Sequence, residues 1–179
     1  ANASVHFTPG FAPKSAIGKS RAEIALASFD GAPSPCVRTN PSKPAVLPIL
    51  EGSEPVRWNG FAHMLARRPV FTLHPLFHCG AYYVQDSSAM FVGELFREVL
   101  KKFTGDRMLK VLDLCAAPGG KTTDLAASLR AACGENFLLV ANEVMRQRAT
   151  VLADNVARWG DPNVVVTSSD PAAFSALKG

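Results

Sequence analysis

The sequence predicts an α/β fold, in which an N-terminal α+β extension precedes a doubly wound parallel sheet. One observation is a run of apolar residues of strand length at 109–114, followed by a turn of small residues and a helical pattern at 121–132. A second is the same alternation repeated up to residue 167. The third is the absence of this alternation from the first half, where residues 31–55 contain six prolines.

The segment around which the fold is organised is 109–123, with the sequence LKVLDLCAAPGGKTT. Its residues predict a buried strand, a tight turn and the start of a helix. This geometry is typical of a nucleotide or cofactor site, because glycines let the backbone approach a ligand and the first turn of a helix has unpaired N–H groups.

Three classes of ligand use such a turn. A phosphate-binding loop needs glycine five residues before its Gly-Lys-Thr, where this chain has Cys115, and the dinucleotide pattern of three spaced glycines is absent. S-adenosylmethionine has no phosphates, so a shorter turn suffices, and Asp113 at the strand end can accept hydrogen bonds from it. A purely structural strand–turn–helix unit is the alternative.

The string DLCAAPGGKTT at 113–123 resembles the cofactor motif of the RNA 5-methylcytosine methyltransferases of the NOL1/NOP2/Sun family, especially bacterial ribosomal RNA enzymes of the RsmF type. The resemblance implies a Rossmann-like methyltransferase sheet with S-adenosyl-L-methionine as cofactor. The cofactor-binding residues expected in this way are Asp113, Cys115, Ala116, Ala117, Pro118, Gly119, Gly120, Lys121, Glu143, Arg148 and Asp170.

Two of the acidic residues follow further predicted strands. Glu143 follows a strand predicted at 136–141, lies 23 residues after Gly120, and offers a carboxylate that can accept both hydroxyl protons of a ribose. After a helix predicted at 144–159 and a strand at 163–167, Asp170 matches the family position that contacts the adenine amino group. A helix or turn cap is the alternative role for Asp170.

Residues 79–90 resemble a second signature of the family. The last residues of that signature are in a different order here, Ser87-Ser88-Ala89-Met90. A helix should follow, capped by Asp86 or Ser87 and ended by Gly105. Its apolar residues recur at helical spacing, and we expect them to pack on the sheet. They are Val92, Leu95, Phe96, Val99, Leu100 and Phe103.

The region 1–80 is predicted to be an RNA-facing extension, with poor order at 1–20 and a short helix at 21–29. Residues 36–43 resemble the family's R-x-N-P-x-K segment, which makes Arg38, Asn40 and Lys43 surface or RNA-facing groups. A strand followed by a turn is an equal alternative.

The charge of the chain is concentrated in its first part. Residues 1–110 contain 13 Lys and Arg against 8 Asp and Glu, a net charge of +5, whereas residues 111–179 have a net charge of −1. A basic first half suits a polyanionic substrate such as RNA. Arg67 and Arg68 are candidate RNA-binding residues, and the nearby Trp58 and Phe61 are either base-stacking or core residues.

The four cysteines, at 36, 79, 115 and 133, form no C-x-x-C pair, which disfavours a zinc site, and no other metal site is expected. Few cysteines and no signal-peptide pattern predict a reducing, cytoplasmic compartment, and no apolar run is long enough for a membrane helix.

The resemblance covers the front half of the methyltransferase domain, here 81–179. In the family, a fourth and a fifth strand carry the cysteine nucleophile and its product-releasing partner, so we expect no catalytic residue among these 179 residues and no activity from this chain alone. The proposed activity of the whole protein is cytosine-C5 methylation of RNA, most simply ribosomal RNA. The alternatives are a non-catalytic RNA-binding or assembly factor, a transfer RNA enzyme and a small-molecule methyltransferase.

Overall fold

The computed structural model describes residues 18–28, 34–103 and 107–176, which belong to two compact units, 1–34 and 35–179. In the first unit the described element is the helix α2 (Lys19–Ser28), which confirms the predicted short helix. Poor order was expected for 1–20; residues 1–17 lie outside the described part, and Lys19 and Ser20 are helical. None of the helices in the described ranges is long and apolar enough to cross a membrane.

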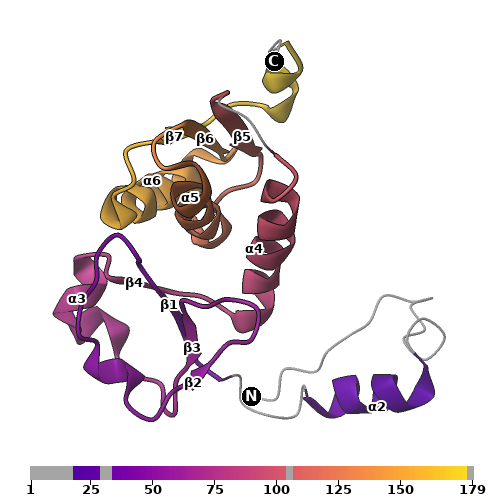
Figure 1. Ribbon diagram of the computed structural model, residues 1–179, viewed down its shortest axis with the longest axis vertical. Helices are drawn as coiled ribbons and strands as arrows, with labels where there is room; N and C mark the ends of the chain where they lie inside the picture. The colour runs from indigo at the N-terminus through magenta and orange to yellow at the C-terminus, as the bar shows by residue number, and fades with distance from the viewer. Residues whose placement is uncertain (1–17, 29–33, 104–106, 177–179) are drawn as a thin grey trace. The chain divides into compact units, whose positions relative to one another are not determined.

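The second unit begins with a four-stranded antiparallel sheet in the order β2-β3-β1-β4 (Figure 1). Val37 of β1 pairs with His63 of β3 on one side and with Val84 of β4 on the other. The elements are β1 (Cys36–Thr39), η1 (Pro48–Leu50), β2 (Glu54–Pro55), β3 (Ala62–Met64), η2 (Phe71–Leu73), α3 (Pro75–His78) and β4 (Tyr82–Val84).

The alternation of side chains along β1 gives this first sheet two different faces. Val37 is fully buried in an apolar cluster with Leu47, Leu65 and Tyr82. Because successive side chains of a strand point to opposite faces, Arg38 leaves the sheet on the other side, and there it bonds to the helix that follows the glycine turn. One face of the small sheet is therefore its own core, and the other is a contact surface.

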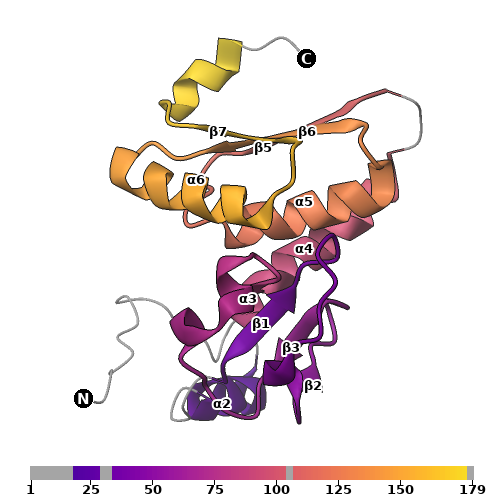
Figure 2. The ribbon, with the colours of Figure 1, turned by 90° about the vertical axis from the view of Figure 1, so that its left-hand side faces the viewer.

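The second sheet is parallel, in the order β5-β6-β7, and α5 and α6 form a layer on one of its faces (Figure 2). Each crossover between parallel strands is a helix, as the predicted alternation requires. The predicted strands and helices of this region are confirmed within a few residues at their ends. They are β5 (Leu109–Asp113), α5 (Gly120–Cys133), β6 (Phe137–Asn142), α6 (Arg146–Trp159) and β7 (Val164–Thr167), followed by η3 (Pro171–Ala176).

The two faces of this sheet differ in burial. Phe137 and Leu139 of β6 are buried in a cluster with residues of α5. Leu112 of β5 and Val165 of β7, which point the other way, are 40% and 46% exposed. Within the described residues, β5 is therefore half-buried rather than the fully buried strand that its apolar run predicts.

The helix α4 (Ser87–Leu100) begins as predicted, since the Asp86 carboxylate accepts hydrogen bonds from the backbone N–H groups of Ser88 and Ala89. It ends at Leu100, and Gly105, its predicted end, lies outside the described residues. The cap of α4 and its apolar period were thus sufficient to find the helix, but not its last turn.

The expectation that the apolar stripe of α4 packs on the sheet is wrong for most of its members. Val92, Leu95 and Val99 are all more than 40% exposed. Leu100 and the partly buried Phe96 do pack in the cluster that joins α5 and β6, whereas Met90 packs in a cluster with the first sheet. The helix α4 contacts two neighbours, so each of them covers only part of its surface. The helical spacing of the apolar residues does not indicate which of them make these contacts.

The division expected at residue 80 stays a prediction. In the structure β4, which lies after that point, completes the first sheet, and residues 35–179 cluster as one unit. The first sheet, the parallel sheet and the glycine turn therefore belong to one compact unit.

Gly80 tests the packing of the first sheet against α6. Its φ of +70° is unfavourable for other residues, and a Cβ atom there would lie 1.9 Å from the backbone oxygen of Arg158. We expect Gly80→Ala to lower the free energy of unfolding by about 2 kcal/mol or more, measured by urea denaturation. Gly60→Ala is the matched control, because its Cβ would meet nothing within 4 Å. Equal stability of the two variants would contradict this packing.

Candidate functional site

The carboxyl ends of β5, β6 and β7 meet at one edge of the parallel sheet, and Asn142 connects them. Its side-chain nitrogen donates to the backbone oxygens of Leu114 (3.4 Å) and Ser169 (3.0 Å). Its side-chain oxygen accepts from the Thr167 hydroxyl (2.9 Å) and the Ser169 N–H (3.0 Å). Sequence reasoning did not single out this buried residue, because a polar residue at a strand end carries no signal of what it joins.

The glycine turn lies between β5 and α5. Gly119, which precedes the helix, has a left-handed backbone with φ 109° and ψ 2°. Cβ atoms at Gly119 and Gly120 would lie 3.2 Å from Leu152 and Gln85, respectively. Close packing behind the turn therefore leaves little room for a side chain at either position, and the left-handed conformation favours glycine at Gly119. Of the other expected cofactor residues here, Ala116 and Ala117 are buried, and Cys115, Pro118 and Lys121 are exposed.

Side chains from two other elements, α6 and β4, hold the carbonyl groups of this turn. Arg148 of α6 donates to the oxygen of Ala117 at 2.9 Å. Asn155 and Tyr83 donate to the oxygen of Pro118 at 2.7 and 3.2 Å. The turn is therefore fixed from behind before any ligand binds, which lowers the entropic cost of binding one.

The acidic residues expected to bind the cofactor lie at the same sheet edge. Asp113 accepts a hydrogen bond from the Thr122 hydroxyl at 2.8 Å. Glu143 is 3% exposed; one oxygen accepts from the Met145 N–H at 3.1 Å, and the other lies 3.3 Å from Arg148. Arg148 therefore links this carboxylate to the turn.

Asp170 is exposed and follows β7. Its carboxylate accepts a hydrogen bond from the Ala172 N–H at 2.8 Å, which is the capping role given above as the alternative. A carboxylate has room for further donors, so the adenine contact stays a prediction.

Arg38 is the largest fully buried side chain in the described ranges, and it reaches the first turn of α5. Its guanidinium donates to the Gly120 oxygen (3.2 Å), the Thr123 hydroxyl (2.6 Å) and the Thr123 oxygen (3.4 Å). It lies 3.8 Å from Asp124 and 4.6 Å from the centre of the Trp159 ring. Burial lowers the pKa of Arg38 to about 10, and Asp124 opposes this shift, so the group stays charged at neutral pH.

The expectation that Arg38 and Asn40 face RNA is therefore corrected in favour of the strand-and-turn alternative. Asn40 is 2% exposed and donates to the oxygens of Gly80 (3.0 Å) and Trp159 (2.9 Å). Lys43, which is half-buried, donates to the oxygen of Arg158 at 2.7 Å. The donors of this segment bind the α6 end and the α5 start, because a buried donor without a partner is costly.

The other two residues expected to bind RNA, Arg67 and Arg68, are exposed, and their role stays a prediction. The guanidinium of Arg68 lies 5.8 Å from the centre of the Phe71 ring. Trp58 donates to the oxygen of Ser87 at 2.7 Å and packs with a core cluster, as a core residue would. Phe61 is 44% exposed.

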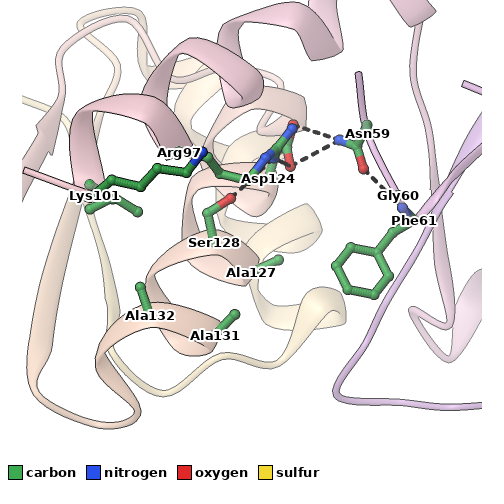
Figure 3. Close-up of a pocket in the computed structure, with 11 residues that line it drawn as sticks. Asn59, Gly60, Phe61, Arg97, Lys101, Asp124, Ala127, Ser128, Ala131 and Ala132 are labelled. Atoms are coloured by element: carbon green, nitrogen blue, oxygen red, sulfur yellow. Dashed lines mark hydrogen bonds and ion pairs between the residues drawn. The ribbon is translucent and has the colours of Figure 1, made fainter. Parts of the chain in front are cut away.

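A cavity of about 360 Å³ lies between α4, α5 and the loop at 59–61 (Figure 3). The polar side chains of its wall bond to one another. Asn59 donates to both oxygens of Asp124, and Arg97 contacts Asp124 and the Ser128 hydroxyl. None of the expected cofactor residues lines it. We assign this cavity to the packing of the two helices, and the candidate cofactor site to the sheet edge.

Comparisons with known proteins agree with the resemblance. Residues 99–179 match the family model of the 16S rRNA methyltransferase RsmB/F. Ribosomal RNA small subunit methyltransferase F of Shewanella loihica is 40% identical over 96 residues, 53% of this chain and 18% of that protein. The enzyme of the same name from an Enterobacter species is 37% identical over 98 residues, with 54% and 18% covered.

A crystal structure of a methyltransferase homolog from Pyrococcus horikoshii superposes with a TM-score of 0.68 and 25% identity, covering 93% of this chain and 55% of that one. The predicted Rossmann-like fold and the resemblance to the methyltransferase family are thereby confirmed for the matched residues. The chain spans about a fifth of the length of the curated relatives it matches.

Arg38 provides a test of how the site is held together. Arg38→Met preserves the approximate size of the side chain. It removes the positive charge near Asp124 and the hydrogen bond donated to the Gly120 oxygen. We expect the free energy of unfolding to fall by about 3 kcal/mol or more, the scale of breaking a buried ion pair, in chemical denaturation. Arg67→Met, at an exposed position, is the control and should change it by less than about 0.5 kcal/mol. A similar small effect at position 38 would contradict the network.

Proposed function

We propose that this chain binds S-adenosyl-L-methionine at the carboxyl edge of the β5-β6-β7 sheet and forms the cofactor-binding part of an RNA cytosine-5 methyltransferase. The observation that carries the proposal is that the glycine turn and the carboxylates of Asp113 and Glu143 share one edge of a sheet whose residues match a ribosomal RNA methyltransferase family. The similarity to enzymes named for the small ribosomal subunit supports ribosomal RNA as the substrate.

The residues of the edge fit the chemistry of this cofactor, which supplies an electrophilic methyl group on a sulfonium. The Glu143 carboxylate is held in place by Met145 and Arg148, and we expect its remaining lone pairs to accept the two hydroxyl protons of a ribose. The start of α5 offers N–H groups to a carboxylate. Asp113, fixed by Thr122, adds negative charge suited to the cationic end of the ligand.

Methylation at cytosine C5 also needs a thiolate that adds to C6, because C5 is not nucleophilic enough alone; a base then removes the C5 proton. Cys36 is buried in the first sheet, and Cys133 ends α5. Cys79 is exposed beside Gly80, which packs against Arg158 of α6. Cys115 is exposed in the turn itself, where the family resemblance makes it part of the cofactor site. These positions support our expectation that the catalytic thiol is none of the four.

The ribose role of Glu143 is tested by Glu143→Ala. Loss of hydrogen bonds to this carboxylate should weaken S-adenosyl-L-methionine binding by about 1–3 kcal/mol, measured by titration calorimetry on folded protein. Glu98→Ala, on the exposed side of α4, is the control and should bind normally. Unchanged affinity in the Glu143 variant would reject this role.

The catalytic expectation is tested with labelled cofactor and ribosomal RNA. The 179-residue chain should transfer no methyl group to RNA although it binds the cofactor, because no thiol is placed to attack cytosine C6. Methyl transfer by this chain that disappears in Cys115→Ser would overturn both the expectation and the assignment of that cysteine to the cofactor site.

A further inference from the structure

A second cleft, of about 300 Å³, lies between the first sheet and α6. We call it the aromatic cleft, because its lining includes Phe71, Phe77, Tyr82, Tyr83 and Trp159, together with Arg158. No Asp or Glu lines it. None of the residues expected to bind the cofactor lines it, although Tyr83 and Asn155 of its lining also hold the glycine turn.

The composition of the aromatic cleft suits an unpaired nucleobase with its phosphate. Phe71 and Phe77 are partly exposed, and each has a guanidinium near its ring: Arg68 at 5.8 Å from Phe71 and Arg158 at 4.8 Å from Phe77. Rings stack on any base, and cations beside them attract the backbone phosphates. A lining with no carboxylate does not repel a polyanion.

The wall of the aromatic cleft is also the support of the glycine turn. Tyr83 and Asn155, both in the lining, donate to the oxygen of Pro118. Arg158 in turn donates to the side-chain oxygen of Asn155 at 3.1 Å. The aromatic cleft therefore adjoins the glycine turn from behind.

We propose that the aromatic cleft binds one unpaired base of the RNA substrate, stacked against the Phe71 and Phe77 side, with Arg158 on its phosphate. The inference rests on the proposed function in its choice of RNA as the ligand. It assigns a base-binding role to residues outside the cofactor edge.

The test uses an eight-nucleotide single-stranded RNA that contains 2-aminopurine, whose fluorescence falls when the base stacks. Titration of the 179-residue chain should quench the probe and give its Kd. Phe71→Leu, which removes a ring, should weaken binding roughly 5- to 100-fold and reduce the quenching. Arg158→Gln should weaken it about 5-fold and lower its salt dependence. Arg57→Gln makes the same charge change at an exposed position outside the cleft and is the matched control.

Each outcome decides. Weaker binding and less quenching in both variants, with the control normal and melting temperatures retained, support the cleft. Normal binding and quenching in Arg158→Gln and Phe71→Leu would overturn it while leaving the proposed function intact. A wild-type chain that binds S-adenosyl-L-methionine but no RNA would overturn the cleft and the RNA part of the proposed function together. If Phe71→Leu fails to fold, Arg158→Gln decides alone, because its side chain is not part of an apolar cluster.

Discussion

The structure depends on the burial of one charge, the guanidinium of Arg38. A cation without exposure to water is stable only where oxygens converge on it, and in this chain they converge at the first turn of α5. Since β1 places Val37 in one core and Arg38 on the opposite face, the small sheet has to dock on that turn. Asp124, which also contacts Arg97, extends the same network to α4. The first sheet is therefore part of the body that holds the glycine turn, as much as the parallel sheet is.

This arrangement explains how a turn of small residues can be rigid. Small side chains make few contacts of their own, so the turn is fixed through its carbonyl groups: Ala117 by Arg148, Pro118 by Asn155 and Tyr83. All of these donors approach from behind, from α6 and β4. A turn held in this way keeps its shape when the ligand is absent, and preorganisation of this kind places a reacting group within the narrow range that catalysis requires.

Local patterns were sufficient to predict the parallel sheet and its helices, because each strand–turn–helix unit is specified within about 30 residues. The same patterns failed where a side chain meets a distant element. The segment at 36–43 predicted equally a surface and a strand, and only its docking on α5 makes Arg38 a buried group. The apolar period of α4 found the helix but not its neighbours, since Leu100 meets α5 and Leu95 meets solvent. Asn142 joins three strand ends through bonds that no spacing in the sequence reveals.

The basic residues of the first half consequently fall into two groups, those bonded inside the protein and those exposed to solvent. Arg38, Lys43 and Arg97 contribute to the net charge of +5 in residues 1–110, yet their donors are bonded to protein oxygens. A cation bonded in this way has little left to offer a phosphate, whereas Arg67 and Arg68 are exposed and can exchange counterions for one. The formal charge therefore overstates the positive surface that is available to a polyanion. It also does not show where on the chain that surface lies. Arg158, which belongs to the near-neutral second half, lies beside the aromatic rings of the cleft that we propose for an RNA base.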